Sequence, residues 1–198
     1  MVQAAQKPCV FLDRDGCVSV EAGYINHPSR IRLERGAAQA IRMLNQAGVL
    51  AVLATNQSGV ARGYFTEETL AKTHAALCRK LQRHGARLDA LYYCPYHPNG
   101  AVPQYAIDSN LRKPNAGMVK RACQDLPIDL AHSYMIGDKI TDVYFGHRIG
   151  LKSILVLTGY GLGEYEFQRD TWTEQPDHIA HNLLEAVKWT LNDMKARR

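Results

Sequence analysis

The chain has 198 residues, of which 46% are hydrophobic and 22% charged. This composition is typical of a globular protein and excludes a disordered, collagen-like or disulfide-scaffold chain. The length predicts that residues 1–198 form a single domain. The 24 basic and 19 acidic residues leave a net charge of +5. That charge admits nucleic acid, anionic lipid or phosphorylated metabolites as partners and selects none of them.

Cysteine usage and hydropathy bear on the cellular compartment. The 5 cysteines are scattered along the chain and form no Cys-x-x-Cys pair, which predicts reduced thiols. No apolar run approaches the ~20 residues of a membrane span. Residues 1–8 also lack the apolar core of a signal peptide. We therefore expect a soluble, cytoplasmic protein without a membrane partner.

Short apolar runs alternate with helical patterns along the chain. The apolar runs predict five strands, at residues 9–12, 49–54, 88–93, 133–136 and 153–157. Helical spacing, with N-caps at Thr66 and Asn182, predicts helices at residues 37–47, 66–84, 118–124, 141–149 and 182–194. This alternation predicts an α/β fold with a doubly wound, Rossmann-like parallel sheet. No long insertion interrupts the first three strands, so we expect a minimal cap domain or none.

Ligands of such sheets bind just beyond the carboxyl ends of the strands. The first predicted strand is followed there by Asp13-Arg14-Asp15-Gly16. Two carboxylates so close together are costly unless their charge is used. One can serve as a nucleophile or metal ligand and the other as an acid–base group. For this pair alone, a solvated acidic turn is an equally good interpretation.

Three more polar segments follow predicted strands or end the long loop at residues 94–115. The segment 55–59, Thr-Asn-Gln-Ser-Gly, offers a hydroxyl, an amide and loop N–H groups to a phosphate. Arg112-Lys113-Pro114 offers two cations, and Asp138 and Asp142 begin the helix after the fourth strand. Taken singly, residues 55–59 are better explained as a polar turn and the basic pair as solvated, and a helix N-cap competes as the explanation of Asp138 and Asp142. Together at one sheet edge, they predict phosphoryl transfer with Mg²⁺.

The order of these motifs resembles the haloacid dehalogenase-like phosphatases. The resemblance spans about residues 9–158 and is strongest in the segments 11–16, 55–63, 92–95, 112–114 and 134–139. These segments resemble the branch that holds heptose-bisphosphate and histidinol-phosphate phosphatases, and Gly23-Tyr24 and residues 58–63 favour the heptose side. The resemblance implies a Mg²⁺-dependent hydrolase that removes the 7-phosphate of a heptose 1,7-bisphosphate, in the nucleotide-heptose pathway to lipopolysaccharide core or surface glycans. Histidinol phosphate or another small sugar phosphate is the alternative substrate.

The same resemblance implies a role for each matching residue. Asp13 is the nucleophile that becomes an aspartyl phosphate, and Asp15 is the general acid and base. Mg²⁺ is held by Asp13, the main-chain carbonyl of Asp15 and Asp138, with Asp142 supporting the metal site. The residues expected to bind the phosphoryl group or the rest of the substrate are Thr55, Asn56, Gln57, Ser58, Arg112, Lys113, Lys139, Glu21, Ala22, Gly23 and Tyr24.

One departure from the resemblance concerns zinc. Relatives that carry zinc have a Cys-x-His and a Cys-x-Cys pair in the long loop, and this chain keeps Cys94 but has Tyr96, Ser109 and Leu111 at the other positions. Cys94 and the nearby His97 supply at most two of the four ligands that a structural zinc site needs. We therefore expect no zinc, and we expect prolines and aromatic packing to hold the loop.

Two other classes of function compete with the phosphatase. A receiver domain also forms an aspartyl phosphate, but its Thr and Lys come in a different order after the acceptor. A nucleic-acid-binding module is weaker, because the basic residues are dispersed and no basic, aromatic-rich strand occurs. The expected partner is a small phosphorylated sugar, whose distal phosphate has Arg62 and Arg112 as candidate contacts. No nucleic acid is expected, and the protein is predicted to be a monomer.

Overall fold

The computed structural model describes residues 5–197 and contains one six-stranded parallel sheet in the order β3-β2-β1-β4-β5-β6. The strands are β1 (Lys7–Leu12), β2 (Leu50–Asn56), β3 (Ala90–Cys94), β4 (Ile128–Gly137), β5 (Lys152–Val156) and β6 (His178–Ala180). The chain runs outward from β1 to β3 and then returns to place β4 beside β1. That return creates a switch point at the carboxyl ends of β1 and β4, where sheets of this type bind ligands.

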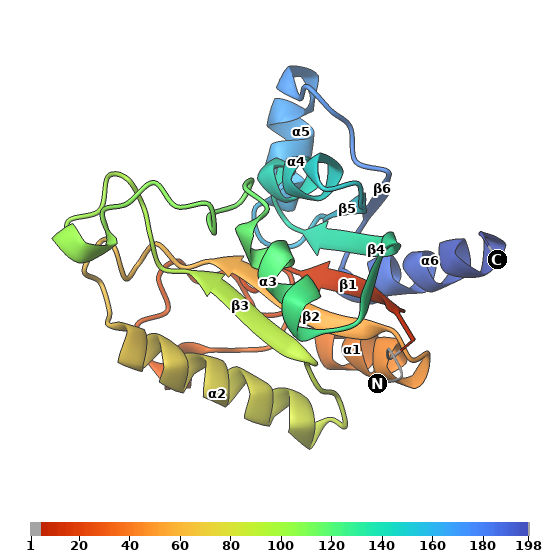
Figure 1. Cartoon of the computed structure of the whole chain (residues 1–198), viewed down its shortest axis with the longest axis horizontal. Helices are drawn as coiled ribbons and strands as arrows, with labels where there is room; N and C mark the ends of the chain where they lie inside the picture. The colour runs from red at the N-terminus through yellow and green to blue at the C-terminus, as the bar shows by residue number, and fades with distance from the viewer. Residues whose placement is uncertain (1–4, 198) are drawn as a thin grey trace.

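Helices cover both faces of the sheet (Figure 1). They are α1 (Ala37–Gln46), α2 (Glu67–Arg83), α3 (Gly117–Asp125), α4 (Ile140–Arg148), α5 (Gly161–Gln168) and α6 (Leu183–Ala196). The cluster of buried side chains on one face draws on α1, α2 and α6, and the cluster on the other draws on α3 and α4. Helix α5 lies outside α4 and packs near Trp172. The predicted doubly wound α/β fold is confirmed.

The central strand explains why both faces are covered. Val10 and Leu12 point into the cluster beneath α1 and α6, whereas Cys9 and Phe11 point into the cluster beneath α3 and α4. All four side chains are fully buried. A strand that is apolar on both faces is stable only when both faces are packed, and this requirement selects the layered arrangement.

The helix caps were predicted correctly, whereas two elements near the C-terminus were not. The side chain of Thr66 accepts a hydrogen bond from the N–H of Thr69 at 3.2 Å, and that of Asn182 accepts one from Glu185 at 3.1 Å. Strand β6 has 3 residues, and helix α5 has 8 residues with little amphipathic character. Both are too short or too weakly patterned for periodicity to reveal them.

The loops that follow β1 and β3 lie at the carboxyl edge of the sheet, and no separate cap is inserted between β1 and β3. Within the first loop, an isolated bridge joins Ser19 to Leu33 and so holds two parts of this loop together. Within residues 5–197, no helix has the length and apolar character required to cross a membrane.

Candidate active site

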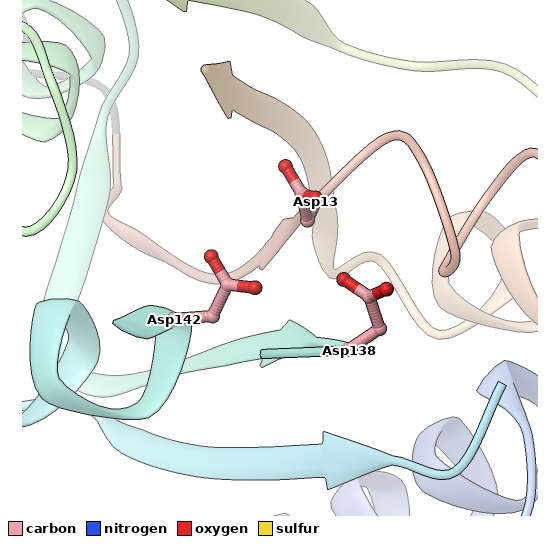
Figure 2. Close-up of side chains that lie close together, drawn as sticks. All are labelled: Asp13, Asp138 and Asp142. Atoms are coloured by element: carbon pink, nitrogen blue, oxygen red, sulfur yellow. The ribbon is translucent and has the colours of Figure 1, made fainter. Parts of the chain in front are cut away.

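Three aspartates meet at the switch point between β1 and β4. Asp13 follows β1, Asp138 follows β4, and Asp142 lies in the first turn of α4. All three are buried, and one carboxylate oxygen of each lies within 4.8 Å of those of the other two. Figure 2 shows the three carboxyl groups directed toward a common centre. Three buried carboxylates so close together repel one another unless a cation joins them.

The chemistry of this cluster fits Mg²⁺. Asp138 accepts a hydrogen bond from the N–H of Tyr160 through Oδ2 at 2.9 Å, whereas its buried Oδ1 has no hydrogen-bond partner among the described residues. Burial, together with the charges of Asp13 and Asp142, raises the pKa of Asp138 to about 8. An oxygen-only set of carboxylates with an unused buried oxygen is the donor set that a hard divalent cation prefers.

Two glycines make the close approach of these carboxylates possible. Gly16 has a φ of 76°, and a side chain there would collide with the carboxylate of Asp138. A side chain at Gly137 would collide with the carboxylate of Asp142 in the same way. The glycine that follows Asp15 therefore serves both the turn and the space that Asp138 needs.

Lys113 is the cation that the protein itself supplies to the cluster. Its ammonium lies 2.7 Å from Oδ1 of Asp13 and 2.6 Å from Oδ1 of Asp142. Burial alone would lower the pKa of Lys113, but the charges of the two aspartates outweigh it and raise this pKa above its ordinary value. Asn56 fixes the lysine backbone, since its side chain accepts from the N–H of Lys113 at 3.0 Å and donates to its carbonyl at 3.2 Å.

Asp15 lies apart from the three clustered carboxylates and has its own set of donors. Arg14 donates to both of its carboxylate oxygens, from Nε to Oδ1 at 3.0 Å and from Nη2 to Oδ2 at 2.7 Å. Gln57 donates to Oδ2 at 3.0 Å and Ser19 to Oδ1 at 3.1 Å. Two neighbouring acids of one sequence motif are thus held in different surroundings, which suits them to different tasks.

A pocket of about 280 Å³ opens over these residues. Most of the predicted site residues line it: Asp13, Asp15, Glu21, Gly23, Tyr24, Thr55, Asn56, Gln57, Ser58, Arg112, Lys113 and Lys139. Ala22 does not line the pocket, because its side chain packs against the core. Arg62 does not line it either, and its guanidinium lies 3.3 Å from Nε2 of His97. The sheet therefore brings together residues from segments far apart in the sequence.

Tyr160 is a pocket residue that the sequence analysis missed. Its side chain is 51% exposed, and its ring lies 4.3 Å from the ammonium of Lys139. Tyr160 begins the segment after β5, at the same edge of the sheet as the other motifs. This segment is a candidate because ligands of such sheets bind beyond the carboxyl ends of the strands, but a single tyrosine among glycines carries no recognisable motif.

The long loop at residues 94–115 is joined to α2 through Glu67. The hydroxyls of Tyr93 and Tyr105 donate to the two carboxylate oxygens of Glu67, at 2.9 Å and 2.7 Å. The thiol of Cys94 donates to the carbonyl of Tyr96 at 3.7 Å. These contacts connect β3, the loop and the first turn of α2. The absence of zinc stays a prediction.

Comparisons with known proteins agree with this geometry. The family model described as HAD-hyrolase-like matches residues 110–186. The D-glycero-D-manno-heptose-1,7-bisphosphate 7-phosphatase of Thermosynechococcus vestitus is 42% identical over 197 residues, which span 96% of this chain and 99% of that protein. The D-glycero-beta-D-manno-heptose-1,7-bisphosphate 7-phosphatase of Escherichia coli is 39% identical over 158 residues, covering 79% of this chain and 82% of that protein.

A solved structure gives the same result in three dimensions. The crystal structure of D,D-heptose 1,7-bisphosphate phosphatase from B. bronchiseptica, complexed with magnesium and phosphate, matches with a TM-score of 0.82 and 30% identity. The match covers 94% of this chain and 99% of that one. Because the sequence likeness extends over nearly the whole of both chains, the chain belongs to the haloacid dehalogenase-like phosphatases, in the family of the heptose-1,7-bisphosphate 7-phosphatases.

Proposed function

We propose that this chain is a Mg²⁺-dependent phosphatase that removes the 7-phosphate of D-glycero-D-manno-heptose 1,7-bisphosphate. The observation that carries the proposal is the buried cluster of Asp13, Asp138 and Asp142 beside the pocket, with Lys113 bridging two of its members. Curated relatives and a magnesium- and phosphate-bound structure support this substrate and metal. The five free thiols support a reducing, cytoplasmic setting.

Substrate binding uses the polar groups of the pocket. The 7-phosphate lies against Thr55 and Lys113, which present a hydroxyl and an ammonium to its oxygens. The distal phosphate lies toward Arg112, which lines the pocket and has no carboxylate partner within 4.0 Å among the described residues. A guanidinium without a carboxylate partner suits a phosphate, which it can bind through two parallel hydrogen bonds.

The reaction runs in two steps on the aspartates of the first motif. A carboxylate oxygen of Asp13 attacks phosphorus, and the bond from phosphorus to the sugar oxygen breaks. The electron pair stays on the sugar oxygen, which takes the carboxyl proton of Asp15 and leaves as an alcohol. Asp15 then takes a proton from water as the water oxygen attacks the aspartyl phosphate, which releases inorganic phosphate and restores Asp13.

The metal and Lys113 both offset the charge repulsion that opposes the first step of the reaction. Attack of a carboxylate on a phosphate dianion brings like charges together. Mg²⁺, held by Asp13, Asp138 and the main-chain carbonyl of Asp15, supplies positive charge that offsets this repulsion. Asp142 holds Lys113 in place from the other side, since one ammonium contacts both Asp13 and Asp142.

The test is release of phosphate, with Mg²⁺, from the two anomers of heptose 1,7-bisphosphate, fructose 1,6-bisphosphate and histidinol phosphate. We expect kcat/KM to be highest for one heptose anomer, and the Asp13→Asn variant to lose on the order of 10³-fold in kcat. Asp108→Asn, at an exposed position of the long loop, is the matched control and keeps full activity. A higher kcat/KM for histidinol phosphate would contradict the proposed substrate, and full activity of the Asp13→Asn variant would contradict the proposed mechanism. Light scattering of the same preparation tests the monomer.

A further inference from the structure

A buried arginine connects the general acid to helix α2. Arg14 lies between the two aspartates of the first motif, and its side chain is only 1% exposed. Nε and Nη2 of its guanidinium donate to the carboxylate of Asp15, whereas Nη1 lies 3.1 Å from Nε2 of His74. His74 belongs to α2 and is 6% exposed. The planar guanidinium is therefore held at both ends, by Asp15 and by the histidine.

The direction of the contact from Arg14 to His74 follows from charge. The guanidinium stays protonated and offers only donors, so Nε2 of His74 has to accept and the imidazole is neutral. Burial, together with the charge of Arg14, lowers the pKa of His74 to about 3, which agrees with a neutral ring. The ring packs against Tyr93, with centroids 5.5 Å apart. His74 is thus a fixed acceptor.

Orientation of Asp15 depends on this arrangement. A carboxyl group that protonates a leaving oxygen has to be held within hydrogen-bond reach of it. The bidentate contact with Arg14 orients the Asp15 carboxylate, with Gln57 and Ser19 as further donors, and the contact with His74 fixes the far end of the guanidinium. No other side chain among the described residues makes a hydrogen bond to Nη1 of Arg14.

We propose that His74 is a positioning residue for the general acid Asp15, acting through the guanidinium of Arg14. The proposal rests on the proposed function, because it assigns the acid role to Asp15. It assigns a task to two side chains that the reaction scheme otherwise leaves unused. It also predicts that the contribution of His74 depends on how much the leaving group needs a proton.

The leaving group separates this role from a purely structural one. A sugar alkoxide is a poor leaving group and needs the proton of Asp15, whereas p-nitrophenolate is a stabilised anion that leaves without one. Loss of correct acid geometry therefore slows formation of the aspartyl phosphate from the alkyl ester and spares its formation from the aryl ester, whereas the later hydrolysis of the aspartyl phosphate is the same for both esters. General damage to the fold would slow both reactions equally.

The experiment compares kcat/KM, which reports the steps up to formation of the aspartyl phosphate, for heptose 1,7-bisphosphate and p-nitrophenyl phosphate in His74→Leu, His74→Gln and Asp15→Asn. In His74→Leu, we expect kcat/KM for the sugar phosphate to fall about tenfold, a part of the 10²–10⁴ that acid catalysis supplies, and that for the aryl ester to change less than about twofold. His74→Gln keeps an acceptor for Arg14 and retains most of the sugar phosphatase activity. Asp15→Asn shows the same selectivity with a larger loss.

Leu77→Ala is the matched control, because Leu77 is a fully buried residue of the same helix and belongs to the core cluster. We expect it to lower thermal stability without changing the ratio of the two kcat/KM values. Equal loss on both esters in His74→Leu, or no loss on either, would overturn the proposal.

Wild-type activity tests the proposed function separately. If the wild type hydrolyses p-nitrophenyl phosphate and another alkyl phosphate but not the heptose, the substrate is wrong and the comparison is made on that alkyl ester. If it hydrolyses no phosphate ester, the role of His74 fails together with the proposed function.

Discussion

At the residue scale, the active site is a balance of buried charges. Three carboxylates lie around the ammonium of Lys113, whose side chain is only 4% exposed where it meets Asp13 and Asp142. Removing these charges from water costs free energy, and their mutual contacts offset only part of that cost. Such a balance is maintained for function, since an apolar core of the same size would be more stable.

His74 gives the site a sensitivity to acid. Its pKa is lowered to about 3 by burial and by Arg14, so the folded protein binds a proton at His74 less readily than the unfolded chain does. Stability from the neutral ring is therefore present above pH 6.5, the ordinary histidine value, and is lost as the pH falls toward 3. We expect the free energy of unfolding of the Mg²⁺-loaded protein to drop by about 2 kcal/mol more between pH 7 and 5 than that of His74→Gln.

Urea unfolding at pH 7, 6 and 5 measures this difference. His181→Gln is the control, since His181 is exposed, and it should follow the wild type at each pH. Parallel pH profiles for the wild type and His74→Gln would show that the buried histidine does not control acid stability.

At the element scale, the long loop after β3 depends on one carboxylate. Glu67, in the first turn of α2, accepts hydrogen bonds from Tyr93 of β3 and from Tyr105 of the loop. Burial and the contact with Glu67 raise the pKa of Tyr93 to about 12, so its hydroxyl remains a donor at neutral pH. The loop leads to Arg112 and Lys113, so its anchoring bears on the pocket.

We expect Glu67→Ala to cost about 2–3 kcal/mol in the free energy of unfolding, because it removes two charge-assisted hydrogen bonds and leaves two hydroxyls without their acceptor. Amide hydrogen exchange should become faster in residues 95–106. The control is Glu68→Ala in the same helical turn, where the pair with Lys72 is exposed to solvent and contributes little to stability. Unchanged exchange in that loop would show that packing alone holds it.

The elements that could be predicted from the sequence are those with a local signal. Buried strands appear as apolar runs, and Thr66 and Asn182 mark helix starts by a cap that each helix forms within its own first turn. Helix α5 and strand β6 have no such signal, because packing against α4 and β5 holds them. Strand β4 begins at Ile128 rather than 133, since Asp129 and His132 interrupt the apolar run in its first half, which is partly exposed.

The candidate site divides in the same way. Asp13, Lys113 and Asp138 belong to motifs whose order along the chain is informative, and the parallel sheet brings them to one edge. His74 and Tyr160 belong to no motif, and only tertiary packing places them beside Arg14 and Lys139. Such residues look like ordinary members of a helix or a loop until the fold is known.

At the scale of the whole molecule, the buried charges and the proposed catalytic residues lie at one place, the switch point of the sheet. Strands β2 and β3 lie on one side of β1, whereas β4, β5 and β6 lie on the other. The carboxyl ends of β1 and β4, which are separated by more than a hundred residues of sequence, therefore meet at the switch point. Asp138 is 0% exposed, and burial together with the charges of Asp13 and Asp142 raises its pKa to about 8. Without a metal, the buried carboxylate of Asp138 therefore lowers the free energy of unfolding, whereas with bound Mg²⁺ it would serve as a ligand.

Stability should accordingly be linked to Mg²⁺. At a free Mg²⁺ concentration of 100 times its Kd, binding to the folded state alone adds about 2.7 kcal/mol and raises Tm by about 5–10 °C. Asp138→Asn removes the buried carboxylate, so we expect the metal-free variant to be more stable than the metal-free wild type by an amount on the order of 1 kcal/mol, and to lose its response to Mg²⁺.

Differential scanning calorimetry with a chelator and then with added Mg²⁺ measures both effects on the whole chain. Asp129→Asn is the control, because Asp129 forms a partly exposed pair with His132 away from the pocket, and it should keep the Mg²⁺ response of the wild type. If Asp138→Asn is less stable than the wild type without metal, the carboxylate is a net stabiliser of the fold. If its Tm still rises with Mg²⁺ as that of the wild type does, the metal is held elsewhere. Either result would break the link between the buried cluster and the metal on which the proposed reaction depends.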